Sequence, residues 1–144
     1  MRRQRPARGG AQIGFECRDD TGDAAHAPVR LCLDVGHQCV PGTTGPDRDP
    51  YAWLTHFGGR LAEVQLQQSD GLADHHWPFT AERNQAGRID PGRVLDALAE
   101  AGAQEVLLVL EVIPAFEQDD AEVLADLRAS AELWRAALTE RGAR

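Results

Sequence analysis

Two Asp-Pro pairs, Asp49-Pro50 and Asp90-Pro91, separate three apolar runs of the sequence. An Asp followed by Pro is typical of a helix start, because the carboxylate caps free N–H groups and proline fits the first turn. The pattern predicts strands over residues 29–34, 61–67 and 105–113, in alternation with helices over residues 49–59, 90–102 and 119–142. Strict alternation of strands and helices favours a parallel sheet with right-handed crossovers, so we expect an α/β fold.

The first part of the chain, residues 1–27, differs from the rest. Arg, Gly and Ala dominate it, and no helical or strand-like apolar period is sustained. We expect an irregular arm there, either disordered or translated from a start or frame that is not native to the gene. The remaining residues, 28–144, are enough for one domain.

Charge and cysteine content exclude several classes of function. The formal net charge is −8 and all 15 basic residues are arginine, so the chain lacks the basic surface that general nucleic-acid binding needs. The three cysteines have no CxxC spacing and indicate neither a disulfide framework nor a zinc ribbon. No apolar run reaches the ~18 residues of a membrane span, and none follows the basic N-terminus as a signal peptide requires. We expect a cytoplasmic protein without nucleic-acid or membrane partners.

Polar side chains follow each predicted strand at the point where it ends. Asp34 ends the first strand and His37 lies just beyond it, Gln67 ends the second, and Glu111 interrupts the apolar run LLVLEVI of the third. In parallel α/β folds the carboxyl ends of the strands meet at one edge and carry the functional groups. Oxygen ligands suit a hard divalent cation such as Mg²⁺ or Mn²⁺. The sequence therefore predicts a metal site formed by Asp34, Gln67 and Glu111.

A metal at this edge suggests proton-transfer chemistry. It would polarise a substrate carbonyl and acidify the neighbouring C–H, and Glu111 would be the catalytic base and acid that moves the proton. His37, one turn beyond Asp34, would either ligate the metal or bind a substrate oxygen.

The segment DHHWPFT, residues 74–80, gives a weaker signal. One interpretation makes His75 and His76 substrate or phosphate contacts, with Arg83 as a charge partner. The other has Trp77 and Phe79 covering the top of a barrel while both histidines are solvated. Adjacent residues point in different directions, so we expect at most one histidine to face the site.

The phrases DVGHQCVPGTTGPDRDPYAWL, LQQSDG, DHHWPFT and LEVIPAFEQDD resemble the xylose isomerase-like barrel family. That family includes sugar isomerases, ketose 3-epimerases and AP endonucleases, and the likeness is strongest to the branch acting on tetrulose phosphates in erythritol catabolism. The resemblance covers roughly residues 28–140. It implies the C-terminal part of a (β/α) TIM barrel, with three of the eight βα units of the full fold.

The same resemblance implies a metal-dependent isomerase or epimerase of small sugars or sugar phosphates. The metal would be Mn²⁺ or Mg²⁺, with Co²⁺ or Zn²⁺ as further candidates. Asp34 and Glu111 would be ligands, Glu111 would also exchange a proton with substrate, and His37 would contact a substrate oxygen. Gln67 stands where the better-known epimerases have a metal-ligating histidine.

Other interpretations stay open. Epimerisation needs proton transfer on two faces of the substrate, and a second glutamate of the family would lie in units that this chain lacks. In this alternative, the chain is a truncated, non-catalytic fragment of such an enzyme. An AP-endonuclease-like activity would need several histidine ligands and a basic groove, and a receiver-like binding module would need its acidic cluster at a single strand end. We also expect self-association, because three βα units expose the apolar face that lines a barrel.

Overall fold

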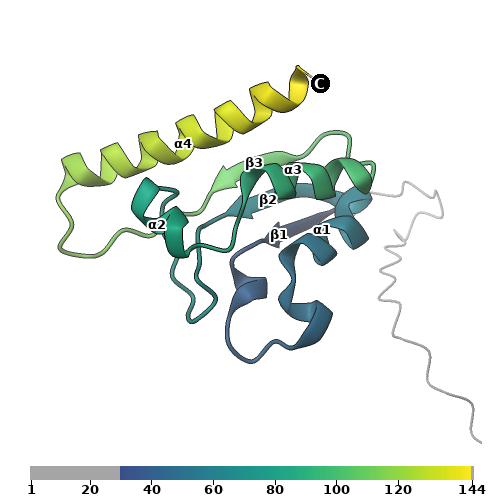
Figure 1. The fold of residues 1–144 in the computed structure, drawn as a ribbon, viewed down its shortest axis with the longest axis horizontal. Helices are drawn as coiled ribbons and strands as arrows, with labels where there is room; N and C mark the ends of the chain where they lie inside the picture. The colour runs from purple at the N-terminus through teal and green to yellow at the C-terminus, as the bar shows by residue number, and fades with distance from the viewer. Residues whose placement is uncertain (1–29, 144) are drawn as a thin grey trace, which may run out of the picture.

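A computed structural model describes residues 30–143, and the predicted arm at residues 1–27 lies outside this range. The centre of the fold is a parallel sheet of three strands, β1 (Leu31–Asp34), β2 (Leu61–Leu66) and β3 (Leu107–Leu110). The strands lie side by side in chain order, as Figure 1 shows. The structure therefore confirms the α/β class with three parallel strands.

Helices cover one face of this sheet. The α-helices are α1 (Pro50–Phe57), α2 (Ala81–Ala86), α3 (Pro91–Glu100) and α4 (Asp120–Gly142), and the short 3-10 helices are η1 (His37–Cys39), η2 (Gly45–Arg48) and η3 (Gly58–Arg60). Helices α1 and α3 pack against each other, and α4 packs against α3 (Figure 1). None of the helices described combines the length and apolar character needed to cross a membrane.

Local capping explains where the helices begin. The side chains of Asp49, Asp90 and Asp119 accept hydrogen bonds from backbone N–H groups in the first turns of α1, α3 and α4. The caps at Asp49 and Asp90 were predicted from the two Asp-Pro pairs. Helix α2 was not predicted: the Thr80 side chain caps it by accepting from the Arg83 N–H at 3.2 Å.

The two faces of the sheet differ because successive side chains of a strand point in opposite directions. Leu33, Val64 and Leu66 point toward the helices and are buried. Cys32, Glu63 and Leu107 are neighbours on adjacent strands, and their side chains point to the opposite face, away from the helices. Leu107 is 61% exposed, so the residues described leave this second face open. In a closed barrel this second face would line the interior.

The long segment between β2 and α2 is anchored in the core. Phe79 is 2% exposed and packs edge-on against Trp134 of α4, with ring centroids 5.3 Å apart. Its backbone N–H donates to Ser130 Oγ at 2.8 Å. Phe79 therefore holds this segment against α4, and does not cover the top of the barrel as one interpretation of the sequence proposed.

Candidate active site

Asp34 is the last residue of β1, and its carboxylate is fixed by the turn that follows. Asp34 Oδ1 accepts from the N–H groups of Gly36 at 2.6 Å and His37 at 3.0 Å. The side chain alternates with Leu33, so it points to the open face of the sheet, yet it is only 8% exposed. The turn thus presents a buried carboxylate at the carboxyl edge of the sheet.

Gln67, directly after β2, lies beside this carboxylate and is fully buried. Its Nε2 atom is 3.0 Å from Asp34 Oδ2 and 3.4 Å from Asp74 Oδ1. Its Oε1 atom accepts from the His76 backbone N–H at 2.8 Å. Gln67 belongs to the cluster, as predicted, but its amide nitrogen and not its oxygen faces the carboxylates.

Glu111, directly after β3, completes the row of strand-end residues. Its N–H donates to Leu66 O at 2.9 Å, which extends the β2–β3 ladder by one residue. Glu111 Oε2 is buried and has no hydrogen-bond partner among the residues described. A buried carboxylate oxygen without a partner is costly, and a bound cation or proton removes that cost.

The carboxyl groups of Asp34 and Glu111 shift each other's pKa in opposite directions. The contact with Asp34, followed by burial and the Asp34 charge, raises the pKa of Glu111. Burial alone would raise the pKa of Asp34, but its contacts with the Glu111 carboxyl group, with Gln67 and with the His37 N–H outweigh burial and lower that pKa. The pair therefore favours a proton on Glu111 over one on Asp34, because two neighbouring carboxylates repel each other.

His76 brings an imidazole to the same pair. Its Nδ1 atom lies 3.2 Å from the Glu111 carbonyl oxygen and 3.9 Å from Glu111 Oε2. Ligand atoms of Asp34, His76 and Glu111 all lie within 4.8 Å of one another. This donor set, two carboxylates and one imidazole, fits a divalent cation.

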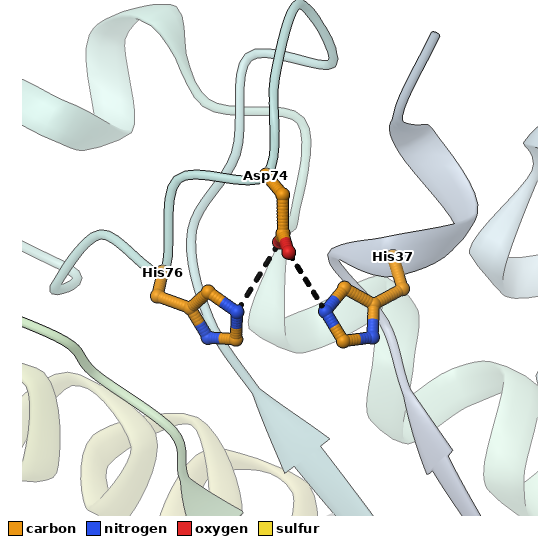
Figure 2. Close-up of side chains that lie close together, drawn as sticks. All are labelled: His37, Asp74 and His76. Atoms are coloured by element: carbon orange, nitrogen blue, oxygen red, sulfur yellow. Dashed lines mark ion pairs between the residues drawn. The ribbon is translucent and has the colours of Figure 1, made fainter. Parts of the chain in front are cut away.

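A second group of side chains adjoins the first (Figure 2). Asp74 lies between two imidazoles, with carboxylate oxygens 3.2 Å from His37 Nε2 and 3.2 Å from His76 Nε2. His37 Nδ1 is 3.6 Å from Asp34 Oδ2, so His37 links the two groups. Asp74 was not predicted as a site residue, although it is the first residue of the DHHWPFT segment.

His75 and Arg83, the other two predicted substrate contacts, both lie against Trp77. The His75 ring stacks on Trp77 with centroids 3.9 Å apart, and His75 Nε2 is 3.0 Å from Asp70 Oδ1. The Arg83 guanidinium lies over Trp77, 4.4 Å from the ring centroid. Of the adjacent histidines, His76 thus contacts the carboxylates and His75 contacts Asp70 and Trp77.

A parallel sheet with carboxylates and imidazoles gathered at its strand ends defines part of an α/β barrel with a candidate cation site. The chain is 33% identical over 108 residues to D-erythrulose 1-phosphate 3-epimerase of Brucella abortus (strain 2308), covering 74% of this chain and 35% of that protein. The chain also matches the crystal structure of a protein from Rhodospirillum rubrum ATCC 11170 that is named as a xylose isomerase. That match has a TM-score of 0.63 and 33% identity, and covers 76% of this chain and 36% of the other. No protein-family model matches the chain.

These likenesses confirm the resemblance to the xylose isomerase-like barrel family, and the fold described is part of such a barrel. The chain spans only about a third of the length of either relative, 35% and 36%.

Proposed function

We propose that residues 30–143 form the metal-binding part of a sugar-phosphate epimerase or isomerase, with a divalent cation held by Asp34, His76 and Glu111. The observation that carries this proposal is the orphaned Glu111 Oε2 atom, buried beside a second carboxylate and an imidazole. Mn²⁺ or Mg²⁺ is the favoured cation, and the imidazole also suits Co²⁺ or Zn²⁺. The cytoplasmic location expected from the sequence belongs to the same proposal.

The side chains around the site have complementary roles in a proton transfer. A bound cation supplies polarisation of the substrate carbonyl. Glu111 moves the proton at the carbon next to that carbonyl, since its raised pKa makes it a stronger base than an ordinary carboxylate. His37, whose side chain is 45% exposed, donates to a substrate oxygen.

The proposed substrate is a small ketose phosphate of the kind named for the Brucella relative, erythrulose 1-phosphate. Arg83 and His75 are the proposed contacts for its phosphate, because a guanidinium is well suited to bind phosphate, with His76 also close to the substrate. Inversion at a carbon centre needs a second acid or base on the opposite face. That group is proposed to come from barrel units beyond those that this chain matches.

Proton exchange next to the substrate carbonyl can be tested separately from complete epimerisation. We would incubate the chain with Mn²⁺ and erythrulose 1-phosphate in D₂O and follow deuterium entry next to the carbonyl by NMR. The proposal expects exchange that depends on Mn²⁺ and is lost in Glu111→Gln, with Glu63→Gln as a matched carboxylate control on the same sheet face. Equal exchange in both variants overturns the role of Glu111. No exchange in the unmodified chain favours the non-catalytic alternative.

A further inference from the structure

The orientation of the Gln67 amide is fixed by its neighbours. On one side lies the His76 backbone N–H, which is only a donor, 2.8 Å from Oε1. On the other side lie the Asp34 carboxylate oxygens, which are acceptors, 3.0 and 3.2 Å from Nε2. Turning the amide around would place donor against donor and acceptor against acceptor. Gln67 therefore presents N–H groups, which bind no cation, to the carboxylates.

The backbone that Gln67 holds is strained. His76 is the one non-glycine residue with positive φ, 50°, in the part of the chain that the structure describes. Such a conformation costs free energy and persists where neighbouring contacts hold it. Here Gln67 Oε1 accepts from the His76 N–H, and the His76 carbonyl accepts from the Ile113 N–H at 3.0 Å. Gln67 thus helps to aim the imidazole at Glu111.

Asp74 completes the orientation of that imidazole. His76 Nε2 lies 3.2 Å from Asp74 Oδ1, while Nδ1 lies 3.2 Å from the Glu111 carbonyl oxygen and 3.9 Å from Glu111 Oε2. A carboxylate that accepts from Nε2–H selects the tautomer whose Nδ1 lone pair binds a metal, a common arrangement around metal-ligating histidines. To do so, Nδ1 must turn from the carbonyl oxygen toward the cation. The Gln67 amide reaches the same Asp74 oxygen at 3.4 Å, so one buried amide contacts both carboxylates and the histidine backbone.

We infer that Gln67 is a positioning residue and that His76 supplies the nitrogen ligand of the site. Gln67 orients Asp34, Asp74 and His76 through both ends of its amide and does not itself coordinate the cation. The positioning part stands on the metal-free hydrogen bonds, whereas the ligand part rests on the proposed function. This assignment replaces the sequence-based expectation that Gln67 is a ligand.

The positioning part is tested without metal, by amide hydrogen exchange of the ¹⁵N-labelled full chain. Gln67→Met removes the acceptor, so the His76 amide should exchange about tenfold faster or more. Gln67→Glu keeps an acceptor there and should keep that amide protected. The Glu111 amide, bonded to Leu66 O, reports on the intact sheet and should be unchanged in both variants. A His76 amide that exchanges equally in Gln67→Met and the unmodified chain overturns positioning by Gln67.

The ligand part is tested with Mn²⁺ by pulsed EPR, which detects directly bound nitrogen. The unmodified chain should show one imidazole nitrogen, and His76→Asn, which tolerates positive φ, should lose it. Gln67→Met should keep the nitrogen but bind Mn²⁺ about 10–100-fold more weakly. The control Gln65→Met, two residues earlier on the same face, should match the unmodified chain.

The remaining outcomes are also decisive. A nitrogen signal that persists in His76→Asn, or unchanged Mn²⁺ affinity in Gln67→Met, overturns the assignment. If the unmodified chain takes up no Mn²⁺, the proposed function and the ligand part fail together, and the exchange experiment alone still decides whether Gln67 positions His76.

Discussion

Gly36 packs directly against the side chain of Gln67. A Cβ atom at position 36 would lie 2.3 Å from both Cγ and Cδ of Gln67, and 2.7 Å from its Oε1. Because the Gln67 amide is buried and hydrogen-bonded at both ends, it has no free direction in which to move. The glycine of the DVGH motif is thus required by a residue from the neighbouring strand.

Gly36→Ala should therefore disturb both the fold and the site. The added methyl group forces the Gln67 amide away from Asp34 or His76, and overpacking of this kind costs about 1–3 kcal/mol of unfolding free energy. Urea denaturation measures the loss. Gly142→Ala is the control, because nothing lies within 4 Å of the Cβ that it would add. Equal stability of the two variants would show that the Gln67 amide is free to move.

Glu111→Gln should separate metal binding from folding. In the metal-free chain the new amide removes one charge from the carboxylate pair and can donate to Asp34, so the unfolding free energy should not fall by more than about 0.5 kcal/mol. The rise in melting temperature on addition of Mn²⁺ should be lost, since a ligand has been removed. Thermal scans with and without Mn²⁺ measure both effects. Glu63→Gln should keep the rise, and a rise retained in Glu111→Gln would exclude Glu111 as a ligand.

Metal affinity should increase with pH. The Asp34 contact and burial raise the pKa of Glu111 above its usual value, so at low pH a proton occupies the oxygen that would bind the cation. Below that pKa, affinity should rise about tenfold per pH unit, and above it the dependence should flatten, because only the ionised carboxylate binds metal. Calorimetric titration with Mn²⁺ over weakly acidic to neutral pH measures this. A pH-independent affinity would show that no proton is displaced.

In the metal-free chain, Asp34 and Glu111 make the unfolding free energy change with pH in opposite directions. Asp34 has a lowered pKa, so its contribution is present above its unfolded pKa and is lost as pH falls through the folded value. Glu111 has a raised pKa, so its contribution is present at low pH and is lost as pH rises through the folded value. The two contributions offset each other in part, so metal affinity reports on the pair more directly than stability does.

The sequence predicted the features that depend on local rules. Caps at Asp49, Asp90 and Asp119 mark real helix starts, and the alternation of elements yields a parallel sheet. The polar residues at strand ends meet because parallel strands place their carboxyl ends together. The sequence alone therefore predicts that Asp34 and Glu111 lie close together.

The parts that were missed depend on tertiary contacts. Helix α2 has only six residues, too few to show an apolar period. The direction of His76 depends on a positive φ and that of Gln67 on contacts with segments distant in sequence. In α4, Leu124 and Leu138 are 52% and 46% exposed while Ser130 is buried. Residue polarity alone therefore does not tell which turns of α4 contact the core.

Self-association through the open sheet face is the last prediction. Leu107, the first residue of the edge strand β3, is 61% exposed on that face, and a second copy would bury it. Leu107→Gln should leave the monomer folded and weaken association by about tenfold or more. Sedimentation velocity over a range of concentrations measures it. Leu124→Gln, an exposed leucine on α4, is the control and should associate like the unmodified chain. Equal association of all three proteins would place the contact elsewhere.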